Sequence, residues 1–396
     1  MKKIFVLTLA LMLTLPLVAC GSRNQGGDQA DGKDKVAMVT DFGDITDQSF
    51  NQTTWEAVAK FGQDNNVATR YYKPTTNDTA GRVAAVELAI ADGYNVIVLP
   101  GYAFGGTVAE ISGQYPDVKF IALDVSEGDL LEGGVALKGE QYDYNPDNWD
   151  LSKYVYMRNV YCATYREELA GYMAGYAAVK LGYTSLGFLG GMKVPAVQRF
   201  GHGYVQGVDT AAKELGIRVE LKYVYGGQFF GDADITAVMD TWYNSGTQVV
   251  FACGGAIYVS AAEAAKKVGG KIIGVDTDQA PVIDGLYGKG ITVTSAAKGL
   301  TPTTIDTLTD VVINGKWADY AGKIAVLGLV SGDEPQRNYL QLPTATTQFA
   351  EGKFTEEDYT AMVKALFDGT VQVSAEITRL PATSNTTLLD LGSIKG

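Results

Sequence analysis

The chain has 396 residues, 46% of them hydrophobic, a length and composition typical of a globular protein with two or three domains. Its formal net charge of −13 argues against nucleic-acid binding, which depends on neutralising phosphates. The single histidine, His202, lies in a helical pattern without a nucleophile motif beside it, and no Cys/His spacing typical of a metal site occurs. We therefore expect no enzyme, no metal and no other cofactor.

The N-terminus has the features of a secretory signal. Lys2 and Lys3 precede an almost wholly apolar run from Ile4 to Leu17, and small residues precede Cys20. This run is too short to span a membrane comfortably, which disfavours an uncleaved anchor helix. The Leu-Val-Ala-Cys sequence resembles the lipobox of bacterial lipoproteins. We therefore expect residues 1–19 to be a signal peptide and Cys20 to carry the lipid that holds the protein on the extracytoplasmic face of the cell membrane.

Residues 20–35 are predicted to be a flexible tether. After Cys20 the stretch contains no apolar residue except Ala30, so it cannot bury a face against a core. One lipid chain binds a membrane only marginally, so stable anchoring requires more than one chain. Loss of Lys2 and Lys3 with the signal would change the formal net charge from −13 to −15.

From Val36 onward, short apolar runs alternate with helical patterns, which predicts βαβ units and a parallel sheet. In the first half the predicted strands are Val36–Thr40, Thr69–Tyr72, Val96–Leu99, Lys119–Leu123 and Tyr154–Val160. The predicted helices there are Phe50–Asp64, with Ser49 as N-cap, Thr79–Asp92 and Thr107–Gln114. The segment Gly133–Lys153 interrupts this rhythm and is expected to be a surface excursion.

A second series of the same kind follows. Its predicted strands are Ser185–Leu189, Val219–Val224, Val249–Ala252, Lys271–Val275 and Ile291–Ser295. Its predicted helices are Tyr165–Leu181, Val197–Leu215, Asp234–Asn244, Ala256–Val268 and Thr301–Asn314. A last helix, Thr355–Phe367, begins with a capping-box pattern, and the polar tail from Ala382 is expected to pack only peripherally. We expect two α/β lobes, formed by residues 36–160 with about 294–330, and by residues 161–293 with about 331–396.

Polar and glycine-rich loops follow the predicted strands in both halves. The first of them, from Asp41 to Ser49, joins a buried strand to a helix. In the second half such loops carry Gly190–Met192, Tyr225–Phe230 and Cys253–Gly255. Open α/β sheets bind ligands outside the carboxyl ends of their strands. A single loop of this kind is usually only a tight turn, but their recurrence in series predicts a ligand cleft between two lobes.

Charged side chains on these loops suit the sugar of a ligand. Asp41 and Asp276 can each accept hydrogen bonds from a vicinal diol, as acidic residues do in dinucleotide sites. Lys298 could donate to the same ribose and offset the buried negative charge.

Aromatic and acidic side chains suit a planar base. Phe50 and Phe229 could sandwich the base, one from each lobe, although the adjacent Phe230 leaves open which ring stacks. Asp47 and Asp124 could accept hydrogen bonds from ring N–H or exocyclic amine groups.

Several spaced blocks resemble the basic membrane protein family, also called PnrA-like. The opening block is Asp41-x-Gly43, then Asp47-x-Ser49-Phe50-Asn51-Gln52 and Trp55. Further blocks are Glu168–Gly175, Gly187–Met192 with Pro195, Phe200-x-x-Gly203-Tyr204-x-x-Gly207, Tyr225-x-Gly227-x-Phe229, Ile273–Gln279 and Thr294-Ser295-x-x-Lys298. The resemblance implies a type I periplasmic-binding-protein fold, with two Rossmann-like lobes and a ligand cleft between them. It also implies a lipoprotein that captures purine nucleosides and delivers them to an ABC transporter permease.

The same resemblance implies roles for individual residues. Ribose contacts fall on Asp41, Asp276, Lys298 and a backbone amide at Gly254 or Gly255. Base stacking falls on Phe50 and Phe229, and base-edge bonds fall on Asp47 and Asp124. Asn51 and Phe200, which belong to the matching blocks, complete the predicted ligand-binding set.

Some features depart from the family pattern or leave alternatives open. Asp47 resembles a position that is Asn in some relatives, and the excursion at residues 142–149 is longer than the family usually shows. The same fold could instead bind riboflavin or another sugar-like or heteroaromatic metabolite; an exported nucleoside hydrolase is disfavoured by the lack of a nucleophile motif. Cys162 and Cys253 are expected to be buried thiols rather than a disulfide, and the protein is expected to be a monomer.

Overall fold

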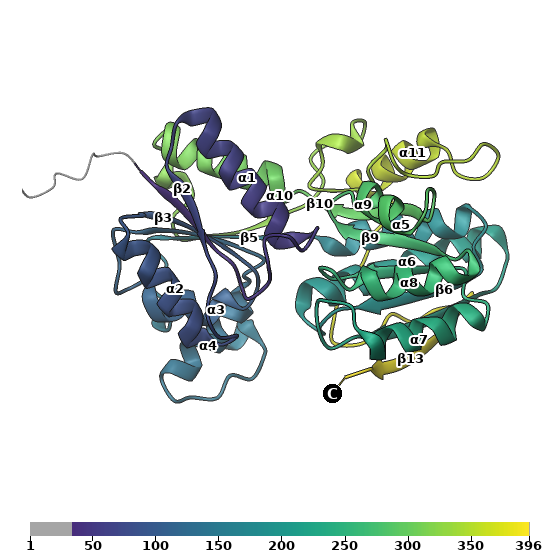
Figure 1. Cartoon of the computed structure of the whole chain (residues 1–396), viewed down its shortest axis with the longest axis horizontal. Coiled ribbons are helices and arrows are strands. Elements are labelled where there is room, and N and C mark those ends of the chain that lie inside the picture. The colour runs from purple at the N-terminus through teal and green to yellow at the C-terminus, as the bar shows by residue number, and fades with distance from the viewer. Residues whose placement is uncertain (1–33, 396) are drawn as a thin grey trace, which may run out of the picture. The chain divides into compact units, whose positions relative to one another are not determined.

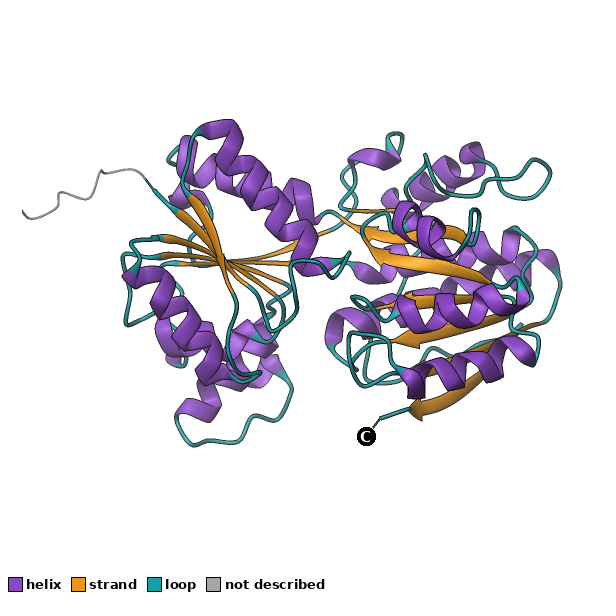
Figure 2. Cartoon of the chain, in the orientation of Figure 1, coloured by secondary structure: helices purple, strands orange, loops and turns teal. Residues whose placement is uncertain are grey.

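The computed structural model describes residues 34–395, so the predicted signal peptide, Cys20 and most of the predicted tether lie outside the described residues. The strands of this part of the chain form two sheets, and helices pack on both faces of each (Figures 1 and 2). We call the first sheet and its helices the N-terminal lobe, and the second sheet and its helices the C-terminal lobe. Within residues 34–395, no helix is long and apolar enough to cross a membrane.

The sheet of the N-terminal lobe has six strands in the order β11-β5-β4-β3-β1-β2, and all neighbouring strands are parallel. The strands are β1 (Val36–Val39), β2 (Thr69–Tyr72), β3 (Val96–Pro100), β4 (Lys119–Leu123), β5 (Val160–Tyr165) and β11 (Lys323–Leu327). The helices are α1 (Phe50–Asn65), α2 (Thr79–Ala91), α3 (Phe104–Ile111), α4 (Glu127–Leu137) and α10 (Leu300–Leu308). Alternate residues of β1 serve the two faces: Val36 and Met38 pack with α1, and Ala37 and Val39 with α2 to α4.

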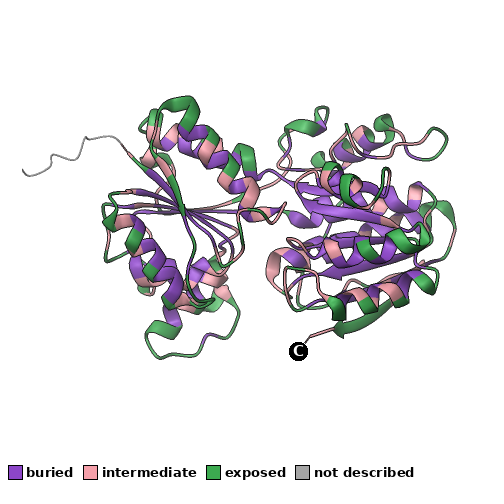
Figure 3. Ribbon diagram, in the orientation of Figure 1, coloured by how far each residue is buried: buried purple, intermediate pink, exposed green. Residues whose placement is uncertain are grey.

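The sheet of the C-terminal lobe has seven strands in the order β12-β10-β9-β8-β6-β7-β13, with β12 antiparallel to β10. The strands are β6 (Ser185–Gly190), β7 (Val219–Tyr225), β8 (Val249–Cys253), β9 (Lys271–Asp276), β10 (Thr292–Lys298), β12 (Leu340–Gln341) and β13 (Thr386–Ser393). The helices are α5 (Glu167–Lys180), α6 (Pro195–Leu215), α7 (Ala233–Asn244), α8 (Tyr258–Val268), α9 (Ala280–Tyr287) and α11 (Glu356–Phe367). Central strands of both sheets are buried, whereas the outer faces of the helices are exposed (Figure 3).

Helices α5 and α6 touch backbone to backbone, and glycines make this possible. A Cβ atom at Gly171 would lie 2.0 Å from the carbonyl oxygen of Phe200, and one at Gly203 would lie 2.0 Å from that of Glu168. The small residues in two of the blocks that resemble the known family therefore serve helix packing. This packing also brings the start of α5, with Glu167, next to Arg199 of α6.

The chain passes between the two sheets at three places: from β5 to α5, from β10 to α10, and from β11 to β12. The first crossing follows Tyr165, because β5 continues to that residue. The second crossing follows Lys298, because the whole of β10 belongs to the second sheet. The predicted boundaries at residues 160 and about 294 were therefore both several residues too early.

Several elements differ from the sequence analysis: the short strands β11 and β12 were not predicted, and α3 begins at Phe104 rather than Thr107. Strand β5 begins at Val160 rather than Tyr154; the residue before it, Asn159, is buried, and its side-chain amide donates to three carbonyl groups of the segment between α3 and β4. Helices α4 and α9 were not predicted, and α4 is rich in glycine because it lies tightly against α3, where a Cβ at Gly133 would lie 2.4 Å from the Cα of Gly106. The tail that was expected to pack peripherally contains β13, which pairs with β7. The capping box of α11, between Thr355 and Asp358, is confirmed.

Candidate functional site

A cavity of about 640 Å³ is lined by loops at the carboxyl ends of strands from both lobes. All the residues that the sequence analysis assigned to ligand binding line it: Asp41, Asp47, Phe50, Asn51, Asp124, Phe200, Phe229, Gly254, Gly255, Asp276 and Lys298. The structure thus brings together side chains that are up to 257 positions apart in the sequence, from Asp41 to Lys298. Their roles toward a ligand stay a prediction.

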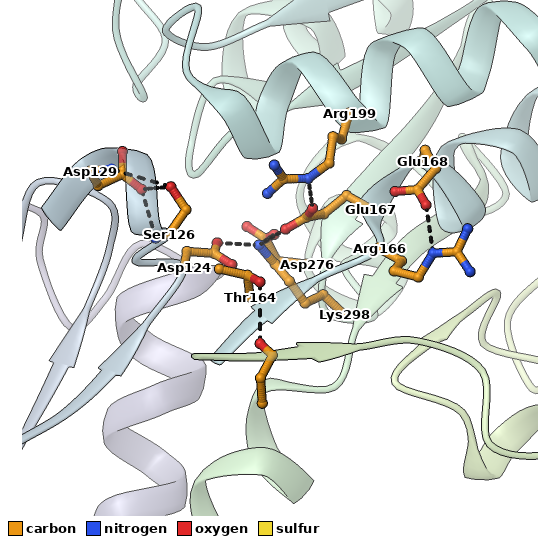
Figure 4. Close-up of polar contacts among 11 residues, drawn as sticks. Asp124, Ser126, Asp129, Thr164, Arg166, Glu167, Glu168, Arg199, Asp276 and Lys298 are labelled. Atoms are coloured by element: carbon orange, nitrogen blue, oxygen red, sulfur yellow. Dashed lines mark hydrogen bonds and ion pairs between the residues drawn. The ribbon is translucent and has the colours of Figure 1, made fainter. Parts of the chain in front are cut away.

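A buried ammonium group lies among carboxylates at one end of the cavity (Figure 4). Lys298, the last residue of β10, has a side chain that is only 2% exposed. Its Nζ is 2.5 Å from Oδ2 of Asp124, 3.5 Å from Oε1 of Glu167 and 3.6 Å from Oδ1 of Asp276. Asp124 follows β4 and Asp276 ends β9, and both have a positive φ, 58° and 65°. Since buried charges must be paired, Lys298 links the two lobes electrostatically.

A second cation balances part of the remaining negative charge. Nε of Arg199 donates to Oε2 of Glu167 over 2.5 Å, so Glu167 bridges Arg199 and Lys298. Burial lowers the pKa of Lys298, but Asp124, Asp276 and Glu167 together raise it above its ordinary value. Burial raises the pKa of Asp124 to about 7, an effect that the nearby Lys298 only partly opposes. The cluster therefore keeps Lys298 charged and makes ionisation of Asp124 costly.

This cluster predicts a pH dependence of folding stability. Asp124 keeps its proton to a higher pH in the folded chain than in the unfolded chain, whose aspartates titrate at about 4. The folded state thus binds more protons in this window, and the contribution of Asp124 to the free energy of unfolding falls as the pH rises from about 4 to about 7. Urea denaturation at several pH values should show a weaker decline in Asp124→Asn than in the wild type. Equal slopes would contradict the assignment.

The start of α1 is organised by Asp47 rather than by Ser49. The carboxylate of Asp47 accepts hydrogen bonds from the backbone amides of Ser49, Asn51 and Gln52, at 2.9, 3.0 and 3.1 Å. Ser49 occupies the N-cap position, but its side chain makes no capping bond. The predicted N-cap position is therefore confirmed, but the capping bonds come from Asp47 and not from the Ser49 side chain. With a further bond from the side-chain amide of Asn51 at 3.1 Å, both oxygens of Asp47 are already used, which argues against its predicted role at a base edge.

Instead, the hydroxyl of Ser49 connects the lobes. It donates to Oδ2 of Asp276 over 2.6 Å, and both residues are buried. A second connection lies beside it, where Nε2 of Gln279 donates to the backbone oxygen of Gln48 over 3.1 Å. The loop before α1 is thus held against the end of β9 by two hydrogen bonds.

Two buried acceptor oxygens that belong to the cavity lining have no hydrogen-bond donor among the described residues: Oδ1 of Asn51 and Oδ1 of Asp124. The amide nitrogen of Asn51 donates to Asp41 and Asp47, at 3.2 and 3.1 Å. Because carboxylates can only accept, this fixes which end of the Asn51 amide is its oxygen. A buried acceptor without a donor costs about 1–3 kcal/mol. The site is therefore prepared for a ligand that brings N–H or O–H groups.

Aromatic rings from both lobes complete the lining. The ring centroid of Phe50 on α1 is 4.8 Å from Nζ of Lys298, and that of Phe200 on α6 is 5.5 Å away. Phe229 lies against glycines, since a Cβ at Gly191 or Gly254 would come within 2.4 or 2.9 Å of its ring. Its neighbour Phe230 is 58% exposed. Both residues line the cavity, but only the Phe229 ring is packed against the glycine backbone.

Sequence reasoning missed four residues of this site: Ser49 as a link between lobes, Glu167, Arg199 and Gln279. Glu167 and Arg199 carried a signal, since each is a charge within an otherwise largely apolar helical pattern, beside a block that was singled out. Ser49 and Gln279 belong to blocks that resemble the family, but the sequence does not show their bonding partners, which lie 227 and 231 positions away. Cys162 and Cys253 are both buried free thiols. Among the described residues, no group of His, Cys, Asp and Glu side chains could hold a metal ion.

Comparisons with known proteins agree with this geometry. Residues 34–333 match the family described as "ABC transporter substrate-binding protein PnrA-like". Among curated relatives, the ABC transporter nucleoside-binding protein BmpA of Lactococcus lactis is 26% identical over 294 residues, covering 70% of this chain and 75% of that protein. Basic membrane protein B of Borreliella afzelii is 27% identical over 269 residues, covering 66% of this chain and 70% of that protein.

Solved structures resemble the fold. A solute-binding protein of an ABC transporter system from Aeropyrum pernix has a TM-score of 0.62 and 20% identity, covering 86% of this chain and 87% of that one. One from Conexibacter woesei has a TM-score of 0.61 and 19% identity, covering 86% and 99%. Together with the two lobes and the cavity between their loops, these likenesses assign the type I periplasmic-binding-protein fold.

Proposed function

We propose that this chain, which belongs to the PnrA-like family of ABC transporter substrate-binding proteins, captures a purine nucleoside in its cavity and delivers it to an ABC permease. Members of the family are substrate-binding proteins of transporters rather than enzymes. The proposal concerns the ligand and the residues that hold it. One relative, the protein of Lactococcus lactis, is named as nucleoside-binding.

The observation that carries the proposal is the pair of unsatisfied acceptors next to aromatic rings. Oδ1 of Asn51 and Oδ1 of Asp124 have no donor among the described residues, and the residues that carry them line the cavity with Phe50 and Phe229. A purine nucleoside supplies both elements, since its base is a flat ring with N–H groups at its edge and its ribose carries hydroxyl donors. A purely apolar ligand would leave both acceptors unsatisfied, and an anion would meet the carboxylates of Asp41, Asp124 and Asp276.

The arrangement suggests how the ligand would lie. Asp124 and Asp276 share Lys298, so we assign all three to the ribose end, together with Asp41. Asn51 is assigned to the base edge, and Asp47 acts through Asn51 by fixing its amide. We therefore assign the hydrogen bonds at the base edge to Asn51, in place of Asp47 and Asp124.

The location is part of the same proposal. Relatives include a protein of Pyrococcus furiosus named as an uncharacterized lipoprotein, 26% identical over 353 residues. The lipobox-like sequence that ends at Cys20 supports an anchor in the membrane, with the two lobes on the extracytoplasmic side. Labelling with a radioactive fatty acid in a bacterial host should mark the wild type and not Cys20→Ser.

Two adjacent phenylalanines provide a matched test of base stacking. Phe229→Ala should weaken nucleoside binding about 5- to 150-fold, because stacking on an aromatic side chain contributes about 1–3 kcal/mol per base. Phe230→Ala should have a much smaller effect, since the Phe230 ring is 58% exposed. Isothermal titration calorimetry on both variants measures the difference. Equal losses, or a larger loss in Phe230→Ala, would refute the assignment of the stacking ring.

A further inference from the structure

The C-terminal end of the chain contacts the cavity loop that carries Phe229. This loop, residues 226–232, joins β7 to α7, and β13 runs parallel to β7 along the edge of the sheet. Beyond β13, the backbone amide of Ile394 donates to the carbonyl oxygen of Tyr225 over 2.8 Å. The family match ends at residue 333, so the family match does not explain this contact.

Lys395 ties two residues of the loop together. Its Nζ forms an ion pair with Oδ2 of Asp232 and donates to Oε1 of Gln228 over 3.1 Å. The side-chain amide of Gln228 in turn donates to Oδ2 of Asp232 over 2.9 Å. Asp232 is also the N-cap of α7 and accepts from the backbone amide of Ile235 at 3.1 Å. One cation therefore links the start of the loop to the helix that follows it.

The fit at this contact is close. Gly227 has φ +82°, and a Cβ there would lie 2.9 Å from the Cβ of Lys395. Phe229 follows two positions later, and its carbonyl oxygen accepts from the backbone amide of Ala256 over 2.8 Å. The backbone of Phe229 is thus hydrogen-bonded to the loop after β8, and Lys395 is hydrogen-bonded to the adjacent Gln228.

Strand β13 pairs with β7 along the sheet edge, but most of its side chains are exposed. Thr387 and the residues from Leu389 to Ser393 are exposed, so this edge strand adds few side chains to the core. Its end, by contrast, meets Asp232 and lies 3.9 Å from Asp234 through the same ammonium group. Polar contacts hold the segment at both ends: Asp209 of α6 accepts from the backbone amides of Asn385 and Thr386 at its start, and Lys395 pairs with Asp232 at its end.

We propose that residues 386–395 brace the loop 226–232 and that Lys395 is a positioning residue for the wall of the cavity that contains Phe229. The effect on ligand binding rests on the proposed function, because it assumes that this wall receives the ligand. The effect on the loop conformation does not depend on the proposed function. Among the lining residues, Lys395 bonds to Gln228 and lies against the backbone of Gly227, so it would act through the loop conformation.

Hydrogen exchange of the ligand-free protein tests the brace directly. In Lys395→Ala the amides of Gly226, Gly227 and Ala256 should exchange about fivefold faster or more, because local opening becomes easier when the ion pair with Asp232 and the bond to Gln228 are lost. Lys395→Arg should restore slow exchange. The control, Lys364→Ala, removes an exposed lysine of α11 and should leave these amides unchanged. Unchanged exchange in Lys395→Ala would overturn the brace.

Calorimetry with inosine then tests the consequence for the cavity. Lys395→Ala should bind inosine several-fold more weakly than the wild type, and Lys395→Arg should bind nearly as well. Faster exchange with unchanged affinity would overturn the positioning role and leave a purely structural brace. If the wild type binds no nucleoside, the proposed ligand fails, and the exchange experiment still decides whether Lys395 holds the loop.

Discussion

Lys298→Met is expected to destabilise the folded protein strongly. The substitution keeps most of the side-chain volume but leaves the carboxylates of Asp124, Asp276 and Glu167 without the ammonium group that they share. Removing one partner of a buried ion pair costs about 3–5 kcal/mol, because the other charges stay buried and uncompensated. The free energy of unfolding from urea denaturation measures this loss. Nucleoside binding should be lost with it, since Lys298 is assigned to the ribose.

Two further variants separate charge compensation from other effects. Lys364→Met removes a lysine whose side chain is 52% exposed and pairs with Asp333 and Asp368, so it should change the unfolding free energy far less than Lys298→Met does. Adding Asp124→Asn to Lys298→Met should recover part of the lost stability, because one of the uncompensated charges is removed as well. If Lys298→Met and Lys364→Met lower the free energy of unfolding equally, Lys298 does not compensate the buried carboxylates.

Asp276→Ala is expected to have the largest specific effect on ligand binding. It removes the carboxylate assigned to the ribose and also the acceptor for the hydroxyl of Ser49, which links the lobes over 2.6 Å. A hydrogen bond to a charged group contributes about 1.5–3 kcal/mol, so affinity should fall about 10- to 150-fold. Isothermal titration calorimetry with a purine nucleoside measures this change in affinity.

The same loop offers a control. Asp278 lies two positions further on, and its carboxylate accepts from the hydroxyl of Thr346 at 2.9 Å and does not line the cavity. Asp278→Ala should therefore bind nearly as tightly as the wild type. Ser49→Ala, which removes only the bond between the lobes, should show how much of the Asp276 effect comes from that bond. Wild-type affinity in Asp276→Ala would contradict the ribose assignment.

The sequence predicted the fold well, because its strongest signals are local. The edge strand Thr69–Tyr72 and the buried strand Lys119–Leu123 are both found with the predicted bounds, and for the buried strand a short apolar run between turn residues is enough to define it. Helix α4 was missed because glycines weaken a helical pattern, and only the close contact with α3 explains why they are there. Strand β13 was missed because most of its side chains are exposed and its sequence is polar at both ends.

The site was predicted as a set but not in its internal bonds. Loop positions after strands are visible in the sequence, so Asp41, Asp124 and Asp276 could be placed at one edge. Which carboxylate meets which donor depends on pairs that are far apart in the chain. Asp124 and Lys298, 174 positions apart, and Ser49 and Asp276, 227 positions apart, are brought together only by the two lobes.

The measurement that tests the account most directly is isothermal titration of the protein from Gly21 onward, freed of co-purified ligand, with guanosine, inosine, adenosine and riboflavin. The account predicts saturable binding of at least one purine nucleoside at one site per chain, weakened about 10- to 150-fold in Asp276→Ala and also weakened in Phe229→Ala. It predicts no comparable binding of riboflavin. Tight binding of riboflavin with no response to any nucleoside would keep the fold and contradict the proposed ligand.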